Sequence, residues 1–598
     1  MLKQEIKKLI EKELASLGVE VLVVVDYPAD PAHGDYASNV ALISAKKLGK
    51  NPKEVAQEIA EKMRMKNKEW QMFEKIDIAG PGFLNFWIKY DILVASNTSL
   101  DVEMGIFHEK KIVVEYTDPN PFKELHIGHL YSNIIGESLS LLFEASGAQV
   151  RRVDYYGDVG MHVAKSLWGL LKKMKQDNVS LTDLRQQPLT DRITYLGEGY
   201  ALGSNAYAND LTVVEEIKDI NYLVYMSGQE YLQKKLGWQP QIDYHQYLHA
   251  ENKSLYTKVK ELYEAGKDWS LENFERLYKR LGTTFDNYYP ESIAGERGYK
   301  IVKDNIATGI FVESEGAVIF PGEKYGLHNR VFINKLGLPT YEAKELGLAP
   351  WKYEDEPYDL SFIVTATEIA GYFGVLIEAL KQVNPELGKK TKPILHGMVR
   401  LPEGKMSSRW GNVISVGWLL DEAKARVMSR MSDEILDKEA IAEMVGLAAI
   451  KYAFLKSSIG KDIVFDLEES VNFEGNSGPY LQYTYTRAKS VLDKAGKGEG
   501  GFDISRTKIK FTSDERRLLC LLARFPEIVD EAATRYAPQV LCTYLFELAQ
   551  TFNLFYQKSP ILKTEEDIRA FRLHLTDKTG AVLKRGLHLL GISVPDHM

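Results

Sequence analysis

Two histidines three positions apart are the first residues here whose spacing points to chemistry. His126 and His129 enclose Ile127 and Gly128 after a proline-rich loop, and an apolar helical pattern follows. Backbone N–H groups at a helix start are unpaired and partly positive, so a phosphate can bind there beside two imidazole donors. Gly128 lacks a Cβ and lets a flat purine lie against the backbone. We therefore predict a nucleotide site where His126 and His129 stabilise charge developing on a phosphate.

A second segment, residues 402–409, offers two cations and two hydroxyl groups in a glycine-turned loop. Its sequence is Pro402-Glu-Gly-Lys-Met-Ser-Ser-Arg409. Taken alone, such a loop is most simply a solvated surface turn, and a lone His-x-x-His pair is most simply structural. Together, the two segments predict a basic loop whose Lys405 and Arg409 close on a pyrophosphate group.

The residues around the histidine pair have the pattern of a βαβ unit. Residues 111–116 are a short apolar run typical of a buried parallel strand. Apolar residues then recur at helical spacing until Gly147, which suits a left-handed helix end, and residues 150–156 resemble a second strand. The turn carries neither Gly-x-Gly-x-x-Gly nor Gly-Lys-Ser/Thr, so dinucleotide and P-loop sites are disfavoured. The pattern predicts an α/β nucleotide-binding architecture of another kind.

Composition and length indicate a folded protein of several domains. The chain has 598 residues, of which 45% are apolar and 26% charged, and its formal net charge of −8 argues against general affinity for polyanions. Two cysteines without a Cys-x-x-Cys pair cannot build a disulfide framework or a zinc cluster. The charged start is unlike a signal peptide and no apolar stretch has membrane-spanning length, so we expect a cytoplasmic protein that does not enter a membrane.

The sequence predicts three domains. Residues 1–100 are expected to form an α+β module that includes a buried strand at Val21–Val25. Residues 101–417 are expected to form the nucleotide-binding domain, interrupted by a polar helical insertion at about residues 172–286 and resumed by strands such as Val318–Phe320. The remainder, residues 418–598, has repeated helical stripes and is predicted to be an all-α bundle.

The two motifs, in this order, resemble the HIGH and KMSKS signatures of class I aminoacyl-tRNA synthetases, whose catalytic domain is a Rossmann-like α/β fold. Other segments narrow the resemblance to the arginyl-tRNA synthetase family. Residues 33–40 and 80–86 are similar to its N-terminal tRNA-binding module, and residues 118–129 to its active-site entry. Residues 473–483 and 589–598 are similar to its helical anticodon-binding domain.

The resemblance implies ATP-dependent ligation of L-arginine to tRNA(Arg) through an arginyl-adenylate, with release of AMP and pyrophosphate. It implies Mg²⁺ bound to ATP, no metal held by protein ligands, and a monomer. A guanidinium with five donors is best bound by carboxylate and carbonyl acceptors. The implied residues are, for catalysis, Lys123, His126, Gly128, His129 and Lys405; for ATP, His126, Ile127, Gly128, His129, Lys405, Met406, Ser407, Ser408 and Arg409; for arginine, Glu115, Asn120, Tyr341, Glu345 and Glu368; and for tRNA, Asn85, Tyr480, Tyr483 and Met598.

Two positions depart from the family pattern. Ser408 stands where the second lysine of the KMSKS motif is expected, and in similar members a lysine just before the HIGH motif, here Lys123, is thought to compensate. Glu345 stands where the family usually has the aspartate that pairs with the substrate guanidinium. Because of these two departures, other substrates and a catalytically silent protein are considered as alternatives.

Two alternatives to arginine ligation remain. One is the same chemistry with another amino acid, or adenylyl transfer without tRNA. The other is a catalytically silent RNA-binding protein, which Ser408 would favour and the intact His126, His129 and Lys405 disfavour. For Tyr480 and Tyr483, whose spacing would place both on one helix face for base stacking, the alternative is a pair of core aromatic residues.

Overall fold

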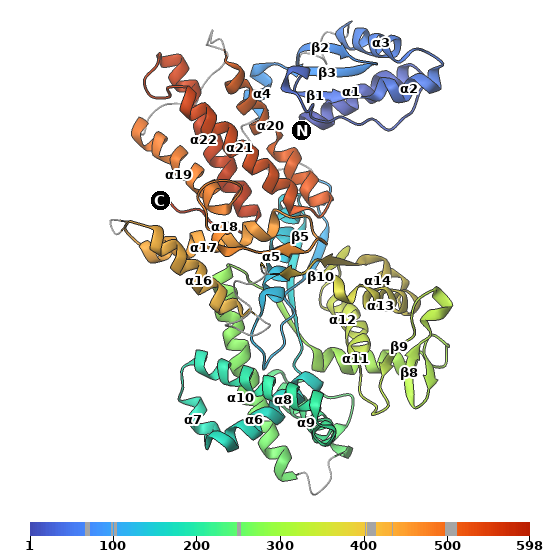
Figure 1. Ribbon diagram of the computed structural model, residues 1–598. Coiled ribbons are helices and arrows are strands. Elements are labelled where there is room, and N and C mark those ends of the chain that lie inside the picture. The colour runs from blue at the N-terminus through green and yellow to red at the C-terminus, as the bar shows by residue number, and fades with distance from the viewer. Residues whose placement is uncertain are drawn as a thin grey trace.

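A five-stranded parallel sheet lies at the centre of the protein (Figure 1). The computed structural model describes residues 1–65, 72–96, 100, 105–247, 253–400, 402, 414–432, 435–496 and 511–598. The strand order is β11-β10-β4-β5-β6, formed by β4 (Lys111–Glu115), β5 (Gln149–Tyr156), β6 (Asn287–Pro290), β10 (Leu360–Ala366) and β11 (Thr391–His396). The winding reverses between β4 and β10, and ligands of such sheets bind at the carboxyl ends beside that reversal. The predicted α/β class is confirmed.

Helix α5 (Ile127–Ala145) joins β4 to β5 and packs on the sheet. It begins after His126, and Gly147, at φ 92°, follows its end. Its contact with β4 is so close that a Cβ at Gly136 would lie 2.2 Å from the Tyr116 ring. The predicted strand–helix–strand unit is therefore confirmed.

The chain between β5 and β6 forms a helical insertion with its own apolar core. Figure 1 shows it below the central sheet. Helices α6 and α8 pack closely because Gly169 has no side chain, since a Cβ there would approach the carbonyl oxygen of Gly199 to 1.9 Å. The helices are α6 (Met161–Asp177), α7 (Leu181–Arg185), α8 (Leu189–Asn209), α9 (Leu211–Leu236) and α10 (Lys253–Leu281).

A second small unit follows β6. Its antiparallel sheet consists of β7 (Val312–Ser314), β8 (Ala317–Phe320) and β9 (Arg330–Ile333). Val318–Phe320 is a strand, as expected, but it pairs with its local hairpin neighbours and does not extend the central sheet. The helices here are α11 (Glu291–Asp304), α12 (Tyr341–Asp355), α13 (Ala370–Val383) and α14 (Pro385–Lys390).

The N-terminal module packs helices against an antiparallel sheet of order β1-β3-β2. The predicted strand at Val21–Val25 is wrong: the segment is extended but outside any ladder, and Leu22 is 74% exposed. The first backbone pairing comes at Asp26, which bridges Ala37. The elements are α1 (Leu2–Ser16), β1 (Tyr36–Ser38), α2 (Val40–Leu48), α3 (Pro52–Met65), β2 (Phe73–Ala79), β3 (Phe83–Ile88) and α4 (Tyr90–Ser96).

The C-terminal part is an all-α bundle, as predicted. It comprises α16 (Val416–Arg430), α17 (Lys438–Leu455), α18 (Leu467–Ser470), α19 (Gly478–Ala495), α20 (Ser513–Thr534), α21 (Pro538–Lys558) and α22 (Glu566–Leu589). A two-stranded pairing of β12 (Val399–Arg400) with β13 (Ile463–Val464) links it to the catalytic part. Helix α20 also contacts the N-terminal module, where Arg516 bonds Asp35 at 2.7 Å. None of the described helices combines the length and the apolar composition that crossing a bilayer requires.

Candidate active site

The paired histidines form the start of α5, at the carboxyl end of β4. His126 is the N-cap residue, and its Nδ1 accepts a hydrogen bond from the N–H of Gly128 at 3.1 Å. His129 Nδ1 accepts from the N–H of His126 at 3.2 Å, and the two rings stack with centroids 3.8 Å apart. Because both Nδ1 atoms are acceptors, the neutral rings are assigned their protons on Nε2, which leaves two N–H donors for an anion.

Both imidazoles are neutral near pH 7. Burial lowers the pKa of His126 to about 4, and the Lys123 ammonium contributes. Burial, followed by His126 and Lys123, holds the pKa of His129 well below its usual value. Two neutral donors at a helix start can bind phosphate oxygens and stabilise charge that develops on them.

Lys123 lies in the loop between β4 and α5. Its Nζ is 4.2 Å from the ring centroid of Tyr200 on α8, a cation–π contact with the insertion. The preceding residue, Phe122, has φ 68°, and its N–H donates to Ser270 Oγ at 2.9 Å. The insertion therefore holds the backbone from which Lys123 extends. Its charge reaches the helix start, since it lowers the pKa of both histidines.

The chain that resumes at Ile414 runs beside the start of α5. The Ile127 N–H donates to Ile414 O at 3.0 Å, and the Val416 N–H donates to Leu125 O at 2.8 Å. The chain that follows the second basic segment, residues 402–409, is thus tied to the start of α5. Outside the described residues lie the predicted ATP ligands Lys405, Met406, Ser407, Ser408 and Arg409.

Glu115, the last residue of β4, is fully buried. Its Oε2 forms an ion pair with Nζ of Lys352 on α12, and its Oε1 has no hydrogen-bond partner among the described residues. An acceptor that is buried without a donor is costly. The free oxygen is therefore suited to a donor from a bound ligand.

Glu345 on α12 and Asp118, three residues after Glu115, form an acidic cluster with Glu115, as their mutual effects on pKa show. Desolvation of its carboxyl group, followed by the Glu115 charge, raises the pKa of Glu345 well above its usual value. The pKa of Asp118 is raised in the same way, by burial first and then by Glu115, Asp154 and Glu345. A cation bound beside this acidic cluster would favour the ionised form of both groups.

Two more of the predicted arginine ligands lie near the carboxyl end of β5. The Tyr341 hydroxyl is 3.4 Å from Nδ1 of His162, and a Cβ at Gly157 would come within 2.5 Å of Asn120 Oδ1. Glu368 is exposed in the short 3-10 helix that follows β10. The structure thus gathers four of the five candidates near β4, β5 and α12, and their contact with arginine stays a prediction.

Several polar residues here were missed by sequence reasoning. His162 Nε2 donates to Gly157 O at 2.8 Å, and burial lowers its pKa to about 3. The Lys344 ammonium bonds Glu291 at 2.7 Å, and the fully buried pair Asp158 and Lys267 is also 2.7 Å apart. For Asp158 and His162 a usable signal existed, because they directly follow the strand predicted at residues 150–156 and parallel sheets bind ligands at those ends.

The predicted tRNA ligands of the helical bundle have different surroundings. Tyr480 packs toward α21, where its hydroxyl accepts a hydrogen bond from Asn553 at 2.9 Å. Tyr483 is 40% exposed, and Arg487 lies 4.8 Å from its ring centroid. Together with Met598, Tyr483 lines an apolar pocket of about 200 Å³, whose other lining residues are Val427, Arg430, Met431, Ser432, Ile435, Ile441, Val445 and Phe473. The pocket is suited to an apolar or flat aromatic group.

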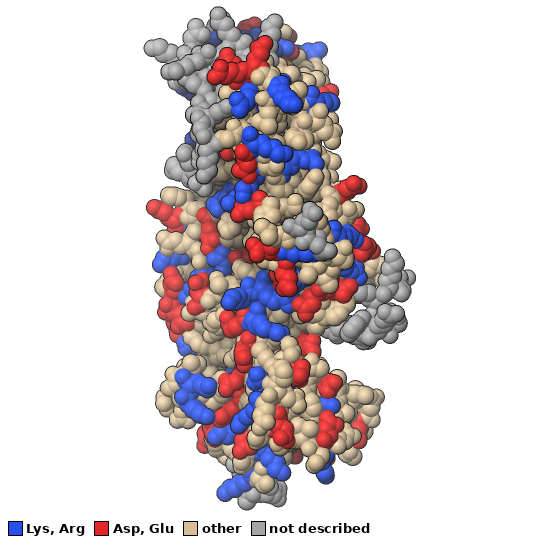
Figure 2. Space-filling model, turned by 90° about the vertical axis from the view of Figure 1, so that its left-hand side faces the viewer, with Lys and Arg blue, Asp and Glu red and all other residues tan. Residues whose placement is uncertain are grey.

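Asn85 lies on β3, opposite Ala37 and Asp77, and is 4% exposed. Its neighbours on that strand, Phe83 and Trp87, are more accessible. On the face drawn in Figure 2, basic and acidic side chains are interspersed, with a group of Lys and Arg near the middle of the molecule. Local basic areas therefore exist on a chain whose net charge is negative.

Comparison with family models agrees with this geometry. Residues 91–467 match the model described as "tRNA synthetases class I (R), catalytic domain". Residues 4–88 match "Arginyl tRNA synthetase N terminal domain", and residues 481–598 match "DALR anticodon binding domain". With the sheet order and the paired histidines at the start of α5, these matches define a class I aminoacyl-tRNA synthetase.

Curated relatives identify the family within that class. An arginine–tRNA ligase of Parabacteroides distasonis is 31% identical over 572 residues, covering 92% of this chain and 91% of the relative. One of Fusobacterium nucleatum is 30% identical over 580 residues, covering 94% and 93%. The chain belongs to the arginyl-tRNA synthetase family.

Solved structures share the fold. The arginyl-tRNA synthetase of Thermus thermophilus superposes with a TM-score of 0.78 at 24% identity, and the alignment covers 100% of both chains. The Plasmodium falciparum enzyme gives a TM-score of 0.75 at 19% identity, covering 100% of this chain and 99% of that one. At these identities the likeness concerns the arrangement of the elements.

Proposed function

We propose that this protein ligates L-arginine to tRNA(Arg) in two ATP-dependent steps. The arginine carboxylate attacks the α-phosphate of ATP, which forms arginyl-adenylate and releases pyrophosphate. A hydroxyl group of the terminal tRNA ribose then attacks the arginyl carbonyl carbon and releases AMP. The observation that carries the proposal is a neutral imidazole pair and a cluster of acidic side chains around the buried Glu115, at the same end of β4.

The first step needs donors for the phosphates and acceptors for the guanidinium. In our proposal the Nε2–H groups of His126 and His129 bind phosphate oxygens, while Lys123 and Lys405 offset charge on the departing pyrophosphate. Mg²⁺ enters with ATP as part of the substrate complex. Glu115 and Glu345 accept hydrogen bonds from the guanidinium, the remaining proposed contacts being with Asn120, Tyr341 and Glu368.

The second step needs bound tRNA. We assign tRNA binding to the N-terminal module through Asn85 and to the helical bundle through Tyr480, Tyr483 and Met598. The apolar pocket beside Tyr483 and Met598 supports this assignment, because unstacked bases bind to aromatic and apolar side chains. We further propose that the enzyme acts as a monomer in the cytoplasm.

ATP–pyrophosphate exchange tests the proposal directly. The full-length protein is assayed with each of the twenty amino acids, with and without tRNA. Exchange that depends on arginine alone among the amino acids is the expected result. Exchange with a different amino acid would show that arginine is not the substrate. No exchange with any amino acid in the presence of tRNA would favour the catalytically silent RNA-binding alternative.

Replacing Glu345 with glutamine is expected to raise the arginine KM by about 5- to 30-fold, because a charge-assisted hydrogen bond becomes a neutral one. Steady-state exchange measures this effect, and the KM for ATP should not change. Glu354→Gln is the matched control, since Glu354 lies on the same helix and pairs with Arg297 at the surface. An unaltered arginine KM in Glu345→Gln would make Glu368 the better guanidinium partner.

Arginine binding is expected to strengthen as pH rises through the raised pKa values of Asp118 and Glu345. Burial and the Glu115 charge raise the pKa of both Asp118 and Glu345, so each group keeps its proton in the free protein to a higher pH than an ordinary carboxyl group does. The guanidinium favours their ionised forms, so binding releases protons and the affinity increases with pH, by up to about tenfold per unit for each proton released. Titration calorimetry in two buffers of different ionisation enthalpy measures that release. A pH-independent affinity without proton release would contradict the account.

A further inference from the structure

Lys352 on α12 forms the ion pair that fixes the carboxylate of Glu115 within the acidic cluster of Glu115, Asp118 and Glu345. Its side chain is 1% exposed, and its Nζ binds Glu115 Oε2 and lies 3.4 Å from Ser361 Oγ. We propose that Lys352 is a positioning residue for arginine: it holds the Glu115 carboxylate as an anion and leaves Oε1 to accept from the guanidinium. The inference rests on the proposed function, because it concerns the same substrate.

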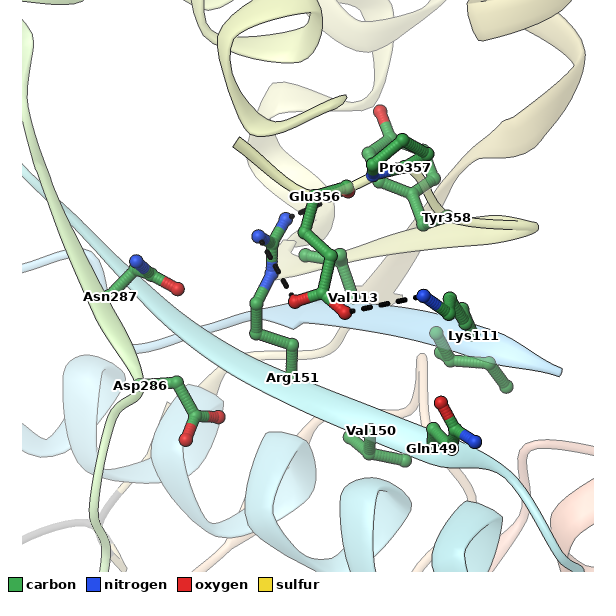
Figure 3. Close-up of a pocket in the computed structure, with 11 residues that line it drawn as sticks. Lys111, Val113, Gln149, Val150, Arg151, Asp286, Asn287, Glu356, Pro357 and Tyr358 are labelled. Carbon is green, nitrogen blue, oxygen red and sulfur yellow. Dashed lines mark hydrogen bonds and ion pairs between the residues drawn. The ribbon is translucent and has the colours of Figure 1, made fainter. Parts of the chain in front are cut away.

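The backbone of Lys352 is itself anchored by the sheet. Arg151 on β5 is buried, and its guanidinium donates to the carbonyl oxygen of Lys352 at 2.7 Å. Arg151 also lies 3.6 Å from the Glu356 carboxylate, which is 3.7 Å from Nζ of Lys111 on β4. Figure 3 shows these three side chains converging in a pocket of about 240 Å³ near the amino ends of the strands. Two contacts therefore hold Lys352 in place: Arg151 binds its backbone carbonyl oxygen, and Glu115 binds its ammonium group.

The charges that face Glu115 explain why a cation is needed. Its charge raises the pKa of Asp118 in the following loop, of Asp154 on β5 and of Glu345 on α12. The other titratable groups influenced by it are Lys352 itself and the hydroxyl groups of Tyr155, Tyr289, Tyr358 and Tyr372. Lys352 is therefore the single cation in this described set, and it lowers the pKa of Glu345.

Removing this cation should favour the protonated form of Glu115. Burial without a counter-ion favours the neutral, protonated form of a carboxyl group over the anion. Glu115 would then donate where the guanidinium needs an acceptor, and arginine would have to displace that proton as well. If Lys352 instead acted on arginine only by repulsion between like charges, its removal would tighten binding.

Lys352→Met tests the proposal, with arginine KM measured by exchange at several pH values in the presence of tRNA. We expect an increase of about 30- to 300-fold near pH 7, the scale of truncating one partner of a buried charge pair. The increase should shrink as pH rises, more steeply than any change in the wild type. The KM for ATP should stay constant, and Lys352→Arg should restore most of the arginine affinity. An arginine KM equal to or below that of the wild type would overturn the proposal.

A second variant keeps the test decisive if Lys352→Met does not fold, because loss of one partner of a buried ion pair strongly destabilises a protein. Glu115→Gln/Lys352→Met removes both charges and should recover thermal stability while arginine stays weakly bound. Wild-type arginine affinity in this double variant would overturn the proposal. The wild-type protein distinguishes failure of the proposed function from failure of this inference. If the wild type does not activate arginine, the proposed function is wrong. If the wild type is active and the variants bind arginine equally well, only the role of Lys352 is rejected.

Discussion

Replacing His129 with alanine is expected to lower the rate of arginyl-adenylate formation by about 10²–10³, the usual loss when one transition-state donor is removed. The donor is the Nε2–H of a neutral imidazole, because Nδ1 is occupied by the His126 N–H and burial keeps the ring uncharged. Single-turnover adenylate formation measures the effect. Arginine affinity should not change, since His129 lies at the phosphate end of the site.

His129 also caps α5, so a control must separate the two roles. In His129→Asn the amide Oδ1 can lie near the position of the imidazole Nδ1 and accept from the His126 N–H, but the side chain does not reach as far as Nε2. We expect His129→Asn to recover most of the stability that alanine loses, about 1 kcal/mol, and little of the rate. Recovery of the rate by asparagine would show that His129 acts only as a cap.

Lys123→Ala is expected to be severely defective in adenylation, by about 10²-fold or more, because we propose that Lys123 supplies the cation that Ser408 does not. Adding Ser408→Lys should restore part of the loss, so that the two changes are strongly non-additive. Pre-steady-state adenylate formation in the four proteins of this cycle measures the coupling. The Lys123 charge already acts on both histidines, which supports its reach toward the phosphate site.

Lys165→Ala is the matched control for this cycle. Lys165 makes the same kind of contact with an insertion tyrosine, its Nζ lying 4.1 Å from the ring centroid of Tyr207. Its loss should reduce stability slightly and leave adenylation nearly unchanged, with or without Ser408→Lys. Additive effects of Lys123→Ala and Ser408→Lys would end the compensation hypothesis and leave Lys123 as a structural contact of Tyr200.

Sequence patterns correctly predicted those elements of the fold that are specified by residues close together in the chain. The strand at residues 111–116, the helical stripe after His129 and the stop at Gly147 together specify the unit from β4 to β5. Val21–Val25 misled because apolar content does not determine whether a strand finds a partner, and here Leu22 and Val24 face outward. Val318–Phe320 is a strand, yet no local pattern indicates which sheet it joins.

The site was predictable only where its chemistry lies in a short motif. His126, Gly128 and His129 are adjacent in sequence, whereas Glu115 and Lys352 are 237 positions apart and meet only through the packing of α12 on the sheet. Similarly, the spacing of Tyr480 and Tyr483 suggested one shared surface, but α21 engages the first hydroxyl and leaves the second side chain exposed. Such contacts depend on how distant elements pack, so no local sequence pattern predicts them.

Identifying the tRNAs that the enzyme charges tests the central claim most directly. Total tRNA is incubated with the protein, ATP, Mg²⁺ and arginine, uncharged 3′ ends are oxidised with periodate, and the protected species are sequenced. Arginine ligation to tRNA(Arg) predicts protection of tRNAs with arginine anticodons, only when arginine is the amino acid supplied, and loss of this protection in His129→Ala at short reaction times. Protection of other tRNAs, protection with a different amino acid, or no protection at all would contradict the account.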